Sequence, residues 1–157
     1  MASFEKVVAI KWSYYASDGF EYEEMENFAQ TFNILDNGHQ PVLCHRMGGR
    51  GYINRTSVAY PAHDLRMWEL LESRRYEEAQ ASWDKVNIPL DTFHSKIYRR
   101  SGGDARLPKG LMTVMGHAVG APRPPSEPLN QEELAELREL AIGWGWPVPE
   151  QAPAATV

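Results

Sequence analysis

The stretch Val7-Val8-Ala9-Ile10-Lys11 predicts the fold of the segment around it. Four successive apolar residues follow a polar start that contains Ser3, Glu5 and Lys6, and the run ends in Lys11 before Trp12-Ser13. A short unbroken apolar run is typical of a strand buried on both faces, the kind of strand found in parallel sheets. We therefore expect a parallel α/β fold in which Lys11 lies at the carboxyl end of a buried strand.

Two roles are open for Lys11. Burial disfavours the ammonium form, so a lysine at a dry strand end can act as a neutral amine that attacks a ketone. An ordinary lysine at the edge of a strand instead extends its ammonium group into water. The residues of this strand do not distinguish the two roles.

Strands and helices are predicted to alternate after Lys11. A helix over residues 22–31 precedes a second buried strand at residues 32–35, which the turn sequence Asp36-Asn37-Gly38 ends. Pro41 begins a short helix that stops at Gly48-Gly49, and a third strand covers residues 51–53. This βαβαβ order implies a parallel sheet with right-handed crossovers.

Helices are predicted for the rest of the chain, with no further strand after Tyr60. One helix is expected to bury Leu65, Trp68 and Leu71, and Pro89 is expected to separate two later helices. Asn130 and Glu133 form a capping box before a last helix. The predicted helical segments are Pro61 to about Leu71, Tyr76–Val86, Ile88–Tyr98, Leu107–Val119 and a segment from Asn130 to Trp144.

Composition limits the function classes. The 157 residues are 43% hydrophobic, enough for one ordinary domain, and the net charge of -5 argues against nucleic acid or an anionic membrane as a partner. We expect neither a signal peptide nor a membrane-spanning segment. The single cysteine, Cys44, fits a cytoplasmic location and is either a buried structural thiol or a nucleophile.

The carboxyl ends of the three predicted strands are where a parallel α/β sheet places its active site. These ends carry Lys11-Trp12-Ser13, Asp36-Asn37 and Asn54-Arg55-Thr56. Arg55 has a guanidinium group that could bind a carboxylate with two hydrogen bonds, or it is a surface arginine. Asp36 could hydrogen-bond a hydroxylated substrate, or it forms the turn before Asn37-Gly38. His39, Cys44 and His45 lack enough convergent ligands for a metal site.

Several segments together resemble the C-terminal half of proteins of the dihydrodipicolinate synthase and N-acetylneuraminate lyase family. The segments that carry the resemblance are Val7–Lys11, Phe32–Leu35, Gly48–Asn54 and Arg123–Leu129. The resemblance implies a partial (β/α)8 TIM barrel, strands six to eight with their helices, followed by a C-terminal helical region. It divides the chain into residues 1–58, 59–146 and a flexible tail at 147–157.

The resemblance also implies a chemistry. In that family the lysine that ends the sixth strand forms a Schiff base with a 2-keto acid, and Lys11 occupies this position. Ile53 matches a strand-eight position whose backbone lies beside the bound keto acid. Trp12, Tyr14 and Tyr15 depart from the family pattern and are expected to reshape the side of the site that binds the aldehyde. No cofactor is implied.

The expected function is part of a Schiff-base lyase or aldolase acting on pyruvate or a related 2-keto acid. A whole barrel takes roughly 250 residues, and the family's carboxylate-binding loop and proton-shuttling tyrosine come from strands that this chain does not contain. A complementary N-terminal half-barrel chain or a homo-oligomer is therefore expected to complete the fold. The alternative is a non-catalytic half-barrel that binds a partner through its tryptophans, namely Trp68, Trp83, Trp144 and Trp146.

Overall fold

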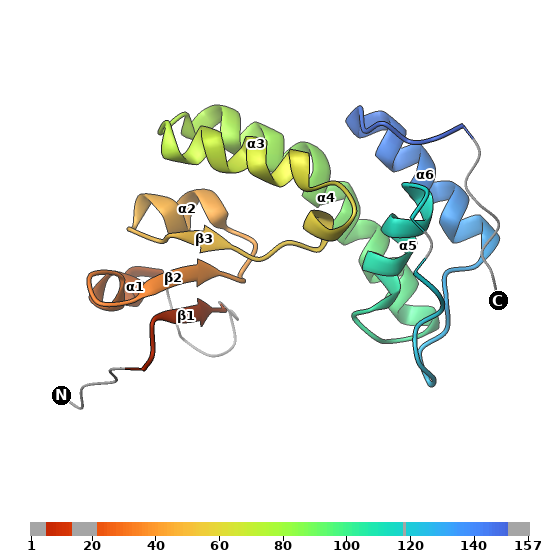
Figure 1. Ribbon diagram of the computed structural model, residues 1–157, viewed down its shortest axis with the longest axis horizontal. Helices are drawn as coiled ribbons and strands as arrows, with labels where there is room; N and C mark the ends of the chain where they lie inside the picture. The colour runs from red at the N-terminus through yellow and green to blue at the C-terminus, as the bar shows by residue number, and fades with distance from the viewer. Residues whose placement is uncertain (1–5, 14–21, 118, 151–157) are drawn as a thin grey trace. The chain divides into compact units, whose positions relative to one another are not determined.

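The computed structural model describes residues 6–13, 22–117 and 119–150. The strands are β1 (Ala9–Trp12), β2 (Asn33–Asp36) and β3 (Gly51–Tyr52). The helices are α1 (Tyr22–Ala29), α2 (Pro41–Arg46), the 3₁₀ turn η1 (Arg55–Val58), α3 (Pro61–Glu72), α4 (Tyr76–Arg100), α5 (Arg106–Val114) and α6 (Gln131–Trp144). Figure 1 shows the strands and the first helices in the order that the sequence predicts.

The three strands form one parallel sheet in the order β1-β2-β3, as predicted. Each strand is joined to the next through a helix, which is the connection that parallel strands require. Pro41 begins α2, and Gly48, at φ 92°, follows its end. The predicted βαβαβ unit is confirmed, although β1 begins two residues later than the apolar run does.

The chain folds as two compact units. The described residues of the first unit are 6–13, 22–54 and 68–79, which include the whole sheet. Its core contains residues from β1, β2, α1 and α2: Trp12, Tyr22, Met25, Ile34 and Cys44. Phe28, which the helical spacing places with Met25 on the apolar face, is 41% exposed.

The second unit contains residues 55–67 and the described residues from 80 onward. Its core is formed by α4, α5 and α6, with Val86, Phe93, Leu111 and Leu137 among the side chains that are at most 2% exposed. Among the described residues of this unit there is no strand. The second unit is therefore a separately packed helical unit, while residues 68–79 of the predicted 59–146 region belong to the first unit.

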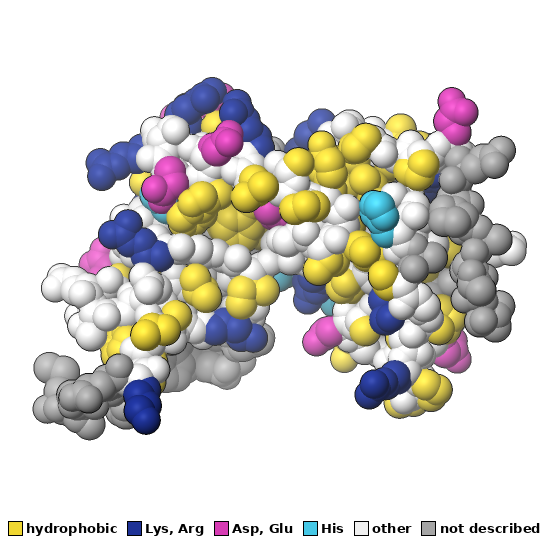
Figure 2. Space-filling model, viewed as in Figure 1, with side chains coloured by type: hydrophobic (Ala, Val, Ile, Leu, Met, Phe, Trp, Pro, Cys, Tyr) yellow, Lys and Arg dark blue, Asp and Glu magenta, His cyan; other side chains and the backbone are white. Residues whose placement is uncertain are grey.

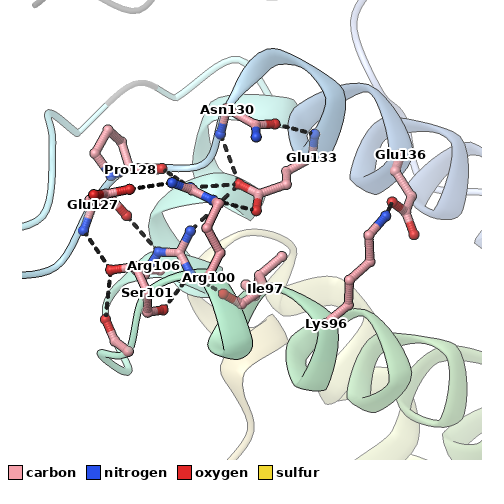
Figure 3. Close-up of polar contacts among 11 residues, drawn as sticks. Lys96, Ile97, Arg100, Ser101, Arg106, Glu127, Pro128, Asn130, Glu133 and Glu136 are labelled. Atoms are coloured by element: carbon pink, nitrogen blue, oxygen red, sulfur yellow. Dashed lines mark hydrogen bonds and ion pairs between the residues drawn. The ribbon is translucent and has the colours of Figure 1, made fainter.

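Polar contacts hold the ends of α4, α5 and α6 together (Figure 3). Arg106 is 2% exposed and donates hydrogen bonds to the backbone oxygens of Ile97, Ser101 and Glu127. The predicted capping box of α6 is present, with 2.8 Å from the backbone nitrogen of Glu133 to Oδ1 of Asn130.

Three predictions about the helices are wrong in detail. α4 runs unbroken through Pro89 instead of dividing there. Leu65 is 64% exposed; α3 buries Met67 in addition to Leu71, which the sequence predicted correctly. α5 ends at Val114, five residues before the predicted end, and Gly116 follows with a positive φ of 83°.

The C-terminal tail is described only as far as residue 150. Val148 packs against the core of the second unit, and residues 151–157 of the predicted flexible tail lie outside the described residues. Among the described residues, no helix is long and apolar enough to cross a membrane.

Candidate active site

The register of the sheet places side chains in two rows across the strands. Lys11 pairs with Leu35, and Leu35 pairs with Gly51. Side chains alternate between the faces of a sheet, so this row lies on the face opposite that of Ile10 and Trp12. None of the three residues belongs to the core that packs against α1 and α2. We call the side that carries this row the open face.

Lys11 is exposed, which corrects the expectation that it is buried at a dry strand end. Val7 and Val8 before it are 43% and 72% exposed, so the apolar run is not buried on both faces. The physical reason is the position of β1, which among the described strands is an outer strand with β2 as its one neighbour. The amine thus lies near the carboxyl end of β1, on the open face and in contact with water.

Gly51 leaves room on the open face. A Cβ atom at this position would lie 2.7 Å from Cδ2 of Leu35, closer than real side chains approach. Without a side chain there, Leu35 can extend over the backbone of β3.

Trp12 lies on the other face, 9% exposed, in the core of the first unit. Its ring centroid is 5.8 Å from that of Phe28. The strand alternation turns this indole toward α1 and away from the face that carries Lys11, so its side chain does not line the open face as the sequence predicted. Tyr14 and Tyr15 lie outside the described residues.

Asp36 is fully buried at the end of β2, on the face that packs against α1. Its Oδ1 accepts a hydrogen bond from the backbone nitrogen of Gly38 at 3.0 Å, and its Oδ2 one from that of Gln40 at 3.0 Å. The Tyr22 hydroxyl also donates to Oδ1. These contacts favour the turn-forming role of Asp36 that the sequence left open.

Burial and the hydrogen bond to Asp36 raise the pKa of Tyr22 above its ordinary value of 10.0. Tyr22 therefore stays a neutral donor that satisfies the Asp36 carboxylate. The sequence does not predict the Tyr22–Asp36 contact, because the two residues are 14 positions apart and no local pattern links them.

Asn37 joins the carboxyl ends of β1 and β2. Its backbone nitrogen donates to the Trp12 carbonyl at 2.7 Å, and its side-chain amide donates to Oγ of Ser13 at 2.9 Å. These contacts fix the backbone directly after Lys11. Asn37 therefore positions the strand end that carries the lysine.

Ile53 follows β3 and its backbone nitrogen donates to the Asp36 carbonyl at 2.8 Å. Its side chain is 43% exposed. Asn54 is the last residue of this segment in the first unit, and Arg55 begins η1 in the second unit, where its guanidinium is 4.0 Å from Asp91. The substrate-binding roles of Ile53, Asn54 and Arg55 stay predictions.

Cys44 is 1% exposed, with its sulfur 3.6 Å from that of Met25. Burial, together with the charge of Asp36, raises the pKa of the thiol to about 12. A thiol that is neutral at physiological pH is a poor nucleophile, which supports the structural role. No group of three or more potential metal ligands is present among the described residues.

Comparisons with known proteins identify the fold. The chain matches no protein-family model, and no relative is found among curated protein sequences. Several solved structures have the same fold over most of the chain, among them the following three. Dihydrodipicolinate synthase from Aquifex aeolicus has a TM-score of 0.71 and 14% identity over 94% of this chain and 48% of that one.

The same enzyme from Oceanobacillus iheyensis gives a TM-score of 0.70 and 19% identity over 90% of this chain and 47% of its own. A catalytic lysine mutant of Ruminococcus gnavus sialic acid aldolase gives a TM-score of 0.62 and 19% identity, over 82% of this chain and 43% of its own. The chain thus spans slightly less than half of each solved structure. Its fold is a partial (β/α)8 barrel like the C-terminal half of these proteins, as the sequence predicted.

Proposed function

We propose that this chain supplies the nucleophilic lysine of a class I lyase or aldolase that acts on pyruvate or a related 2-keto acid. Three of the barrel strands come from this chain, and an N-terminal half-barrel or a second copy completes the barrel. The observation that carries the proposal is the position of Lys11, on the open face of a parallel sheet and near the carboxyl end of its strand.

This position suits imine chemistry. Active sites of parallel α/β barrels lie at the carboxyl ends of the strands, and the interior of a closed barrel is lined by the side chains that face away from the helices. The neutral amine of Lys11 attacks the keto carbon, and the resulting carbinolamine loses water to give a protonated imine. The imine accepts electrons from the adjacent carbon, so a proton can leave or a carbon–carbon bond can break without a metal.

In this proposal, completion of the barrel covers the amine of Lys11. Lys11 is exposed because nothing described pairs with the outer edge of β1. A strand added at that edge would exclude water from the amine. Asn37 keeps the end of β1 in place, and the backbone of Ile53 and the side chain of Asn54 are proposed to receive the keto acid.

Borohydride trapping tests the proposal. The full-length chain is purified in its native assembly, incubated with pyruvate and reduced with borohydride, and its peptides are identified by mass spectrometry. Hydride addition to the imine carbon should leave one pyruvate-derived group on the peptide that contains Lys11. Lys11→Arg should abolish this adduct, because arginine keeps the charge but provides no neutral amine.

Lys6→Arg is the matched control, since Lys6 is an exposed lysine on the approach to the same strand. It should retain the adduct. Thermal unfolding of Lys11→Arg should match that of the wild type, because the side chain is exposed. Labelling of Lys6, Lys96 or Lys109, or of no residue at all in the native assembly, would contradict the proposal.

The alternative of a partner-binding half-barrel with exposed tryptophan anchors loses its main support. Trp83, Trp144 and Trp146 are only 5%, 8% and 6% exposed and belong to buried packing. Trp68 is partly buried, and its ring lies 6.4 Å from that of Tyr52. These side chains serve folding of the chain itself.

A further inference from the structure

A cavity of about 440 Å³ lies at the amino end of β3 in the first unit. The residues that line it are His45, Arg46, Gly48, Gly49, Arg50, Arg74 and Tyr76. β3 begins at Gly51, whereas Lys11 is close to the carboxyl end of β1, and the strands run parallel. The cavity is therefore at the opposite end of the sheet from Lys11.

Three arginines converge on this cavity from three segments. Arg46 is the last residue of α2, Arg50 directly precedes β3, and Arg74 lies in the turn between α3 and α4. Among the described residues that line the cavity there is no carboxylate. Figure 2 shows Lys and Arg side chains gathered over the end of α3 and the start of α4. Like charges held together repel one another, so the arrangement favours a bound anion.

The nearby carboxylates have partners of their own. Glu72 is 3.3 Å from Nε2 of His45, and Glu78 pairs with Arg75. Arg50 and Arg74, in contrast, form no ion pair within the described part of the chain. The positive charge of these two side chains is therefore not neutralised by the protein residues that the structure describes.

Arg46 and Tyr76 give the cavity a fixed wall. The guanidinium carbon of Arg46 lies 4.6 Å from the centre of the Tyr76 ring, a cation–π distance. The Tyr76 hydroxyl is 3.3 Å from Nδ1 of His45. These contacts hold the end of α2 against the start of α4, so Arg46 is placed before any ligand arrives.

The turn after α2 contains two glycines, Gly48 and Gly49. Gly48 has a φ of 92°, and a Cβ on Gly49 would lie 2.8 Å from the backbone oxygen of Cys44. Two hydrogen bonds close the turn, from the Gly48 nitrogen to the His45 oxygen at 3.1 Å and from the Gly49 nitrogen to the Cys44 oxygen at 2.8 Å. This is the Schellman pattern, with glycine at the left-handed position as is usual.

The turn after α3 has the same pattern but a different residue at the left-handed position. Hydrogen bonds run from the Arg74 nitrogen to the Leu71 oxygen and from the Arg75 nitrogen to the Leu70 oxygen, each at 2.9 Å. Arg74 has a φ of 57°, which is unfavourable for any residue with a side chain. An arginine thus stands where glycine would fold better, and its side chain lines the cavity.

We propose that this cavity binds the phosphoryl group of a small phosphate-bearing molecule. Guanidinium groups form paired, charge-assisted hydrogen bonds with phosphoryl oxygens, and three of them surround a space large enough for a phosphate ester. Arg50 and Arg74 bind the phosphoryl oxygens directly, and Arg46 forms the wall of the cavity beside the anion. The proposal is independent of the chemistry at Lys11.

Isothermal titration calorimetry on the full-length chain tests it, with inorganic phosphate, glycerol 3-phosphate and malonate as probes at constant ionic strength. Both phosphates should bind with one site per chain, and malonate should bind more weakly. Comparison of the affinities for inorganic phosphate and glycerol 3-phosphate shows whether free phosphate or a phosphate ester is preferred. Equal binding of malonate would overturn the assignment of a phosphoryl ligand.

Arg74→Gly is the decisive variant because glycine suits the left-handed position. We expect the affinity for phosphate to fall about tenfold or more, as loss of a charge-assisted contact implies, while Tm stays equal to that of the wild type or rises. Arg50→Gln should weaken binding in the same way. Arg99→Gln, at an exposed position of α4 in the second unit, is the matched control and should bind phosphate as the wild type does.

Further results would overturn the proposal as well. One is phosphate binding that is absent or unaffected by Arg74→Gly and Arg50→Gln. Another is an equal loss in Arg99→Gln, which would mean that only the net charge of the chain matters. Tighter binding of a short single-stranded oligonucleotide than of either phosphate would also contradict a small-molecule site.

Discussion

At the scale of single residues, the second unit depends on one buried carboxylate. Glu133 is 6% exposed and accepts hydrogen bonds from Arg100 at 2.8 Å to both of its oxygens. Arg106 lies 3.5 Å away and is itself buried (Figure 3). The same carboxylate accepts from the backbone nitrogen of Asn130 and so completes the cap of α6. A buried cation and a helix terminus thus share one counter-charge.

Glu133→Gln should destabilise the protein by about 3 kcal/mol at pH 7, because it leaves the buried Arg106 cation without its carboxylate. The hydrogen bond from Arg100, with the other contacts, lowers the pKa of Glu133 below its ordinary value of 4.5. Its stabilisation is therefore present above about pH 4.5 and is lost as the pH falls through the lower folded-state pKa. The difference in unfolding free energy between wild type and variant should shrink in that acidic range, as measured by urea denaturation from pH 3 to 7.

Glu136→Gln is the matched control. Glu136 lies three residues after Glu133 in α6 and forms an ion pair with the exposed Lys96 of α4. Surface pairs contribute little, so this variant should unfold close to the wild type at every pH. A Glu133→Gln variant that lost the same stability at pH 3 as at pH 7 would mean that shape, and not charge, matters at this position.

At the scale of elements, α4 shows how tertiary packing overrides a local signal. Pro89 lacks a backbone N–H and its ring conflicts with the carbonyl of the residue four positions before it, yet the helix continues through it from Tyr76 to Arg100. The residues on either side explain this continuity. Val86, Leu90 and Phe93 are each 2% exposed and form one apolar stripe in the core of the second unit.

Pro89→Ala should stabilise the second unit. A proline inside a helix costs about 3 kcal/mol, and its loss raises the entropy of the unfolded chain by up to about 1 kcal/mol, so the expected net gain is about 2 kcal/mol. The measurement is the Tm of the variant by circular dichroism. Pro61→Ala is the control: Pro61 is the first residue of α3, where no N–H is needed, and its Tm should not rise.

At the scale of the whole molecule, the sheet is incomplete as a barrel. Within the described residues β1 and β3 are its outer strands, and Lys11 lies on the face opposite the core that packs against α1 and α2. Exposed strand edges invite pairing with another chain, and the solved structures with this fold are about twice as long as the segment matched here.

We expect that the purified chain does not behave as a monomer of 17.8 kDa. Closing a sheet removes its edges, so the chain should self-associate or bind a complementary half-barrel. Sedimentation velocity over a range of concentrations measures this. A compact monomer that unfolds cooperatively at all concentrations would contradict the prediction.

The sequence by itself determined the order and type of the elements. Apolar runs ending in turn residues located β1 and β2, Pro41 and Gly48 marked the limits of α2, and the Asn130–Glu133 pair marked the start of α6. These signals are local, because caps, turns and apolar periodicity involve residues within a few positions of one another. The resemblance to the C-terminal half of a barrel also depended on their order along the chain.

The tertiary structure alone decided which side chains are covered. Lys11 is exposed because β1 has no second neighbouring strand in the described part of the chain. Trp12 faces the core because the strand alternates, and α4 continues through Pro89 because its flanking residues are packed. The three cavity arginines belong to segments as far apart as α2 and the α3–α4 turn. Burial and the convergence of charges depend on contacts between distant segments, which no local pattern in the sequence contains.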